Sequence, residues 1–138
     1  MDVHYPAVFE AQDPSGYFVR FIDIPEAVTQ GEDLDACVFN GSEVLSLVLE
    51  DYVESGREIP KPTQGLADAH YLAPDPKVQA AVLVRWARGD RSLADLARAL
   101  DTSWPAAKRL EDPRHWPSLK QLDKAAAALG KRLVLAFE

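Results

Sequence analysis

Carboxylates gather in one segment of the chain, residues 16–38, which reads GYFVRFIDIPEAVTQGEDLDACV. Its acidic residues are Asp23, Glu26, Glu32, Asp33 and Asp35, and Arg20 is the one basic residue among them. Such a group could attract the Lys and Arg side chains of a basic partner. It could also bind metal ions for hydrolysis, or serve only solubility on a solvated edge.

The other residues that could do chemistry do not complete a catalytic or metal site. The three histidines, His4, His70 and His115, are scattered, and a lone histidine is usually a surface or core residue. Cys37 is the only cysteine and lies on the apolar face of an expected helix. The sequence has no glycine-rich phosphate loop, no nucleophile elbow and no zinc pattern. We therefore expect no enzyme activity, no cofactor and no metal.

A second kind of chemistry is indicated by residues 92–111, SLADLARALDTSWPAAKRLE. Two short helices around a turn at residues 101–103 are typical of a helix-turn-helix, whose second helix enters the major groove of DNA. Lys108 and Arg109 could then reach bases or phosphates, and the residues that follow could contact phosphates. The candidate DNA-binding residues are Ser92, Ser103, Trp104, Pro105, Lys108, Arg109, Arg114 and His115. The alternative is an ordinary helical hairpin, and Asp101 replaces the glycine that is common in the turn.

The distribution of charge supports two different surfaces. Residues 1–75 hold 15 Asp or Glu against three Lys or Arg, a net charge of −12. Residues 76–138 hold seven against 12, a net charge of +5. An acidic half and a basic half on one chain predict a basic protein partner and a nucleic-acid partner.

The composition, 47% hydrophobic and 27% charged, is that of an ordinary globular chain. No apolar run reaches the roughly 18 residues that a membrane span requires, and the start MDVHYP does not resemble a signal peptide. With a single cysteine there is no internal disulfide, so we expect a cytoplasmic protein with no membrane partner.

The elements that must position these residues follow from the periodicity. Alternating residues predict strands over 3–10 and 17–22, joined by a turn at 13–16, and short strands over 27–31 and 70–72. A three- and four-residue period predicts a helix of about 22 residues that Asp33 caps and Gly56 ends. Its expected buried face is Leu34, Cys37, Val38, Gly41, Leu45, Val48 and Tyr52.

The second half is predicted to be helical. Helices are expected over 78–88, from Ser92, from Ser103 and from Ser118 to Gly130, followed by a strand over 132–137. A proline-rich stretch places the boundary between residues 1–74 and 75–138. The predicted fold class is α+β: an antiparallel sheet with one long helix, and an all-helical domain that ends in a short strand.

The tail, KRLVLAFE, predicts a homodimer. Leu133, Leu135 and Phe137 alternate with residues of the other face, and an isolated strand has unpaired backbone groups. Pairing with the same strand of a second chain about a two-fold axis would satisfy them, in a dimer or a tetramer. The strand could instead fold back onto its own domain or its own sheet.

The N-terminal pattern resembles a known family. Residues 5–10 (YPAVFE), 16–38 and 49–62 (LEDYVESGREIPKP) are similar to the HicB antitoxins of HicA–HicB toxin–antitoxin modules. The resemblance covers the whole chain, because some HicB proteins carry a C-terminal helix-turn-helix followed by a short strand.

This resemblance implies a partial ribonuclease-H-like sheet and helix without nuclease activity. It implies binding to HicA, a small basic RNA-cleaving toxin, and repression of the module's own promoter at operator DNA. The expected toxin contacts are Asp23, Glu26, Gln30 and Glu32, whose carboxylates would take the place of RNA phosphates.

Two other functions stay open from the sequence. A ribonuclease-H-like nuclease would need more carboxylates at strand centres than the sequence offers. A stand-alone helix-turn-helix regulator with an acidic ligand- or protein-sensing domain is the other alternative.

Overall fold

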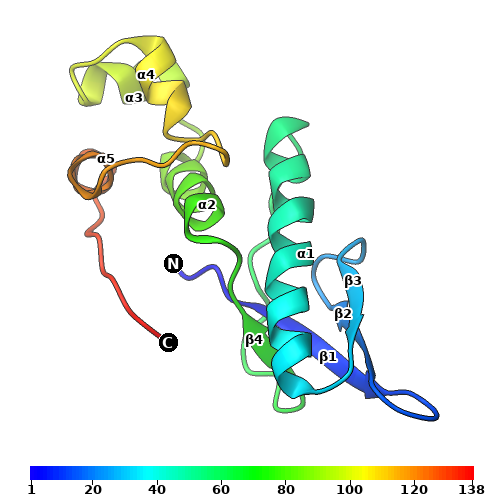
Figure 1. Ribbon diagram of the computed structural model, residues 1–138. Coiled ribbons are helices and arrows are strands. Elements are labelled where there is room, and N and C mark those ends of the chain that lie inside the picture. Colours follow the sequence, from blue (N-terminus) through cyan, green and yellow to red (C-terminus); the bar gives the residue numbers. More distant parts are fainter.

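The computed structural model describes residues 1–138 and shows a mixed α+β fold (Figure 1). A long helix lies along a four-stranded antiparallel sheet, and four shorter helices form a second group beside it. In chain order the elements are β1 (Tyr5–Ala11), β2 (Tyr17–Phe21), β3 (Val28–Gly31), α1 (Leu34–Glu54), β4 (His70–Leu72), α2 (Pro76–Arg88), α3 (Leu93–Ala99), α4 (Trp104–Arg109) and α5 (Leu119–Ala128).

The sheet has the strand order β3-β2-β1-β4, and all its pairs are antiparallel. The four predicted strands are confirmed, as is the turn between the first two, where Gly16 has a φ of +83°. Tyr5 and Ala7 of β1 and Val19 and Phe21 of β2 are buried, and Ala7 pairs with Phe21 across the two strands. These four side chains are buried beneath α1 and form the centre of the larger core.

Helix α1 begins and ends as its local sequence predicts. The Asp33 carboxylate accepts a hydrogen bond from the Ala36 backbone at 2.8 Å, and Gly56 beyond the last turn has a φ of +72°. Of the predicted buried face, Leu34 and Val38 are exposed instead. The neighbouring segment at the start of α2 leaves a groove on that side of α1 rather than covering it.

The second group of helices is built on the predicted caps. Ser92 and Ser118 form capping boxes with Asp95 and Gln121, and the Ser103 hydroxyl accepts from the Ala106 backbone at 3.2 Å. Helix α2 starts two residues earlier than expected, because Pro76 fits the first turn of a helix, where its missing N–H is not needed.

The turn between α3 and α4 is made by Asp101, which takes the left-handed conformation with a φ of +52°. The smaller core lies among α2 to α5 and contains Leu96, Ala107 and Leu129. Helix α2 contributes to both cores, with Val78 and Val82 in the larger and Val84 in the smaller. The boundary between residues 74 and 75 stays a prediction.

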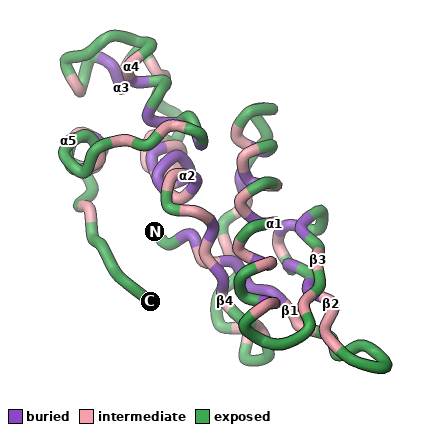
Figure 2. Tube along the Cα trace, viewed as in Figure 1, coloured by how far each residue is buried: buried purple, intermediate pink, exposed green.

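The strand predicted over residues 132–137 is wrong for the single chain. Residues 131–138 form no strand, because a strand needs a hydrogen-bonding neighbour and none lies beside this segment. Leu133 is half-buried, whereas Leu135 and Phe137 are exposed (Figure 2). The end of the tail is held by Glu138, which bonds to His4 near the other end of the chain.

Candidate interaction surfaces

Two of the four acidic-segment residues predicted to contact a toxin have partners within the chain. Asp23, in the loop between β2 and β3, accepts hydrogen bonds from the Thr63 backbone at 2.9 Å and from its hydroxyl at 2.6 Å. Since Thr63 lies in the long connection after α1, this carboxylate fixes that connection against the sheet.

Glu26 lies in the same loop and is bound still more tightly. Its carboxylate accepts from the Tyr52 hydroxyl at 2.7 and 2.9 Å and from Arg57 Nη1 at 2.6 Å. The Arg57 guanidinium in turn lies 3.9 Å from the centre of the Tyr52 ring. The hydrogen bonds from Tyr52 and Arg57 lower the pKa of Glu26 to about 2. Glu26 is therefore ionised and joins the loop to the end of α1.

The lowered pKa of Glu26 depends on the hydroxyl of Tyr52. The Tyr52→Phe variant is expected to raise the pKa of Glu26 towards its ordinary value of 4.5, because the largest cause of its lowering is removed. A lowered pKa means that these contacts stabilise the fold above pH 4.5 and are lost as the pH falls towards 2. NMR titration of the Glu26 carboxyl carbon measures the change.

The matched control is Tyr71→Phe, which removes a hydroxyl that bonds to Thr63 and Leu66 instead. It should leave the titration of Glu26 unaltered. A Glu26 pKa that stays near 2 in Tyr52→Phe would contradict the arrangement.

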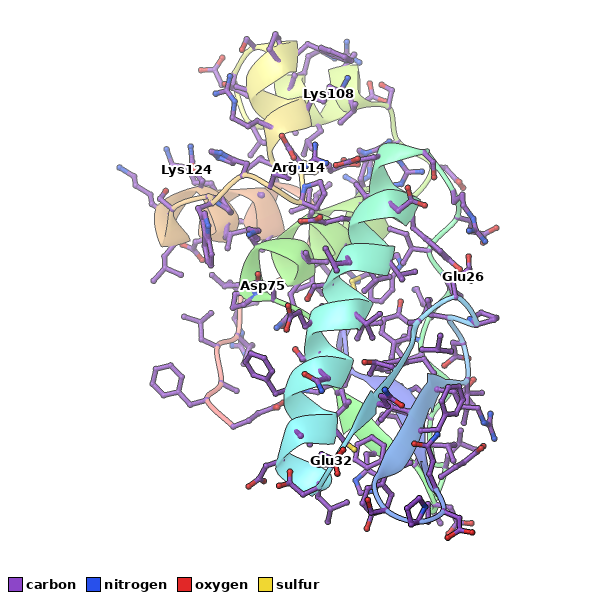
Figure 3. All side chains as sticks on the ribbon, turned by 45° about the vertical axis from the view of Figure 1, so that its right-hand side comes forward. Glu26, Glu32, Asp75, Lys108, Arg114 and Lys124 are labelled. Carbon is purple, nitrogen blue, oxygen red and sulfur yellow. The ribbon has the colours of Figure 1, made fainter.

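Gln30 and Glu32 lie apart from the first pair. Figure 3 shows Glu32 at the N-terminal end of α1 and Glu26 beside its C-terminal half. The Gln30 carbonyl accepts from Asn40 Nδ2 of α1 at 2.8 Å, so the helix covers part of the outer edge of β3. A Cβ atom on Gly31 would lie 2.7 Å from the Cys37 backbone nitrogen, which shows how closely the two elements approach. The four predicted contacts are thus not brought together in one patch, and Glu32 remains exposed.

The sequence-based interpretation missed the outer face of α1. Asp35, Glu43 and Glu50 line a groove there with the exposed side chains of Phe39 and Leu47. The signal available in the sequence was the presence of two large apolar residues at positions outside the buried periodicity of this helix.

The predicted DNA-binding residues lie mostly on or near α4. Trp104, Pro105, Lys108 and Arg109 are all exposed on this helix, and Lys108 Nζ lies 5.2 Å from the centre of the Trp104 ring. Ser92 and Ser103 are N-caps of α3 and α4, so their hydroxyls are engaged with backbone N–H groups.

Arg114 and His115 follow α4 in the chain. Arg114 Nη2 lies 2.8 Å from Glu54 Oε1 at the end of α1, and His115 is half-buried. Both partners of the ion pair are exposed, so this contact is weak and its guanidinium remains open to exchange for a phosphate. Figure 3 shows Arg114 beside the C-terminal end of α1 and Lys108 above it.

A buried ion pair positions α4 on the rest of the chain. Glu111, just after α4, is 8% exposed and accepts from Arg88 Nε at 2.5 Å and Arg88 Nη2 at 3.0 Å. The hydrogen bond to Glu111 raises the pKa of Arg88, which keeps this guanidinium charged. The bidentate geometry gives this pair directional specificity. It ties the end of α4 to the end of α2.

The carboxylates, histidines and cysteine do not converge on a cation site. No group of three or more His, Cys, Asp or Glu side chains is placed to hold a metal ion. Cys37 packs in the larger core, where burial raises the pKa of its thiol. In length and hydropathy, none of the helices meets the requirement for a membrane span.

Comparison with known proteins gives matches over both halves of the chain. Residues 4–73 match the family model described as the HicB-like antitoxin of bacterial toxin–antitoxin systems. The chain is 32% identical to Antitoxin HicB 1 of Photorhabdus laumondii subsp. laumondii, over 99% of this chain and 88% of that protein.

Two further relatives align over nearly their whole length. Antitoxin HicB 2 of the same organism is 34% identical, over 97% of this chain and 96% of the relative. Antitoxin HicB of Escherichia coli K12 is 29% identical, over 98% and 99%. The family match lies in the acidic half, and these relatives extend the similarity across the basic half.

Proposed function

Because the chain belongs to the HicB-like antitoxin family of bacterial toxin–antitoxin systems, we propose that it neutralises a small, basic, RNA-cleaving toxin of the HicA type and represses its own operon at operator DNA. The observation that carries the proposal is the division of charge between the two groups of elements. The half that matches the family model has a net charge of −12 over residues 1–75, and the helical half has +5.

The acidic half supports the toxin-binding role. Its carboxylates can pair with the Lys and Arg side chains that a toxin uses to bind RNA, which blocks the toxin's RNA-binding surface and speeds association. Of the residues predicted to make contact, Glu32 is proposed as a direct contact, because it is exposed at the start of α1. Gln30, whose carbonyl accepts from Asn40 of α1, is proposed to act by holding β3 against that helix. Asp23 and Glu26 are proposed to act by holding the loop between β2 and β3 in place.

The ribonuclease-H-like character of this half is proposed from the family resemblance. The order β3-β2-β1-β4 with one long helix on one face is consistent with it. We propose a binding and regulatory role without catalysis, in keeping with an antitoxin family.

The basic half supports the DNA-binding role. Helices α3 and α4, joined by the turn at Asp101, are proposed to form a helix-turn-helix with α4 as the recognition helix. In this arrangement the exposed side chains of Lys108 and Arg109 face the DNA. Trp104 and Pro105, at the capped start of α4, also lie next to the DNA. Both proposed activities place the protein in the cytoplasm, where the toxin's RNA and the operator are found.

The proposed function is tested with the full chain and the small basic protein encoded by the neighbouring reading frame. The expected result is a stable complex and the loss of RNA cleavage once the antitoxin matches the toxin in concentration. The same chain should shift a DNA fragment carrying its own promoter in a gel. If the basic protein is neither bound nor inhibited, the antitoxin assignment of this chain to that partner is wrong.

A further inference from the structure

The face of α1 that points away from the sheet carries a row of alternating apolar and acidic side chains. Phe39, Glu43 and Leu47 follow at four-residue steps, so they lie in line along the helix over about 12 Å. Phe39 is 69% exposed and Leu47 is 62% exposed. Single exposed apolar residues are ordinary, but large apolar side chains in line beside charges are typical of the anchors of an interface.

This row forms one wall of a groove of about 770 Å³, which we call the α1 groove. The opposite wall is the segment Pro74–Lys77 at the start of α2, and Figure 3 shows Asp75 beside the middle of α1. The Ser42 hydroxyl donates to the Ala73 carbonyl at 2.5 Å, and Ser46 Oγ accepts from the Asp75 backbone at 2.8 Å. The two walls are therefore joined before a partner binds, which lowers the entropic cost of binding.

The α1 groove is lined by carboxylates that have no ion-pair partner within the chain. Asp35, Glu43 and Glu50 line it, and none of them forms an ion pair within the chain. Its one basic lining residue, Lys77, lies 3.6 Å from Asp75 and is compensated by it. A ligand for this groove must therefore bring positive charge as well as apolar surface.

We infer that the α1 groove is the docking surface for the basic toxin, which would place Lys or Arg side chains on Glu43 and Glu50 and an apolar side chain between Phe39 and Leu47. This inference rests on the proposed function and names the surface at which it is carried out. Nucleic acid is repelled by the same carboxylates. A second copy of this chain would bring the acidic rows of two α1 helices together about a two-fold axis, which like-charge repulsion opposes.

Two pairs of substitutions in the full chain test the inference, with the small basic protein of the neighbouring reading frame as the probe. Glu43→Lys with Glu50→Lys is expected to slow association about tenfold or more at low salt, with a smaller effect at high salt. Phe39→Ser with Leu47→Ser is expected to raise Kd about 10- to 100-fold, mainly through faster dissociation. Surface plasmon resonance at two salt concentrations measures both effects.

The matched control for charge is Glu58→Lys with Asp68→Lys, on the exposed connection between α1 and β4. The control for apolar surface is Ile22→Ser with Val28→Ser, whose side chains are exposed at and near β3. Both controls are expected to change association and dissociation much less than the groove pairs. Because the substituted groove side chains are exposed or, for Glu50, half-buried, the thermal unfolding midpoint should stay close to that of the wild type, and each groove pair is interpreted only if it does.

The outcomes separate the two levels of the proposal. If the wild type does not bind the basic protein, the proposed function fails. If the wild type binds and a folded groove pair keeps the wild-type association and dissociation rates, the toxin docks elsewhere and the antitoxin role stands. The same conclusion follows if the Ile22 and Val28 control abolishes binding. If a groove pair does not fold, the single variants Glu43→Gln and Leu47→Ala, each smaller in effect, decide the same question.

Discussion

Changing Lys108 and Arg109 to alanine in the full chain is expected to weaken operator binding by about 1–3 kcal/mol for each side chain that reads a base edge. Both side chains are exposed on α4, which we propose as the recognition helix. A side chain that touches only phosphate should contribute less, and its loss should weaken binding to all sequences alike. Fluorescence anisotropy with an operator duplex and a scrambled duplex measures the two contributions separately.

The matched control for this result removes the same charge from α5. Lys120→Ala with Lys124→Ala lowers the net charge equally, and Figure 3 shows Lys124 on a helix away from Lys108. This control is expected to reduce binding to both duplexes slightly and equally. Toxin binding should survive in both pairs, since it is proposed for the acidic half. If the α4 pair binds the operator as the wild type does, α4 is not the recognition helix.

Deleting residues 131–138 is expected to convert the protein from a dimer to a monomer and to reduce operator affinity sharply. The tail carries the exposed side chains of Leu135 and Phe137, and it forms no strand in the single chain. Pairing with the tail of a second chain would bury these side chains and satisfy the backbone. A dimer can then read two half-sites about one helical turn apart, whereas a monomer reads one. Light scattering coupled to size-exclusion chromatography measures the mass.

A point variant keeps the length of the tail and tests the same interface. Leu135→Asp with Phe137→Asp should also give a monomer, because charges would be buried at the proposed strand pair. The competing arrangement is one in which the tail stays on its own chain. Leu133 and Val134 already line an apolar groove of about 290 Å³ with side chains of α2 and α5, and Glu138 bonds to His4. If the truncated chain stays dimeric, the dimer interface lies in another part of the molecule.

The features that sequence predicts well here are those determined by near neighbours. The caps at Asp33, Ser92 and Ser118 were predicted because each hydroxyl or carboxylate bonds within three residues of itself. The left-handed turn at Asp101 followed from the short distance between two expected helices. The strands followed from alternation, because one face of the sheet is covered by a single helix.

The features that sequence did not predict depend on distant parts of the chain. The sequence predicts Glu26 as a toxin contact and gives no sign of its bonds to Tyr52 and Arg57, which lie 26 and 31 residues away. Val38 was expected to be buried, but the start of α2 leaves that side of α1 open. A helical period gives the direction of an apolar face and not the extent of the surface that covers it.

Helix α2 supplies side chains to both cores, and this has a consequence for the turnover of the protein. Val82 belongs to the larger core with side chains of the sheet and α1, and Val84 packs among the smaller helices, so the two cores share one element. Opening of α2 removes packing from both cores. The two halves of the chain are therefore expected to unfold together in one cooperative event. A protease that captures this open form would then end both proposed activities, toxin neutralisation and promoter repression, in a single step. The rate at which the protein is degraded would therefore set the duration of both activities.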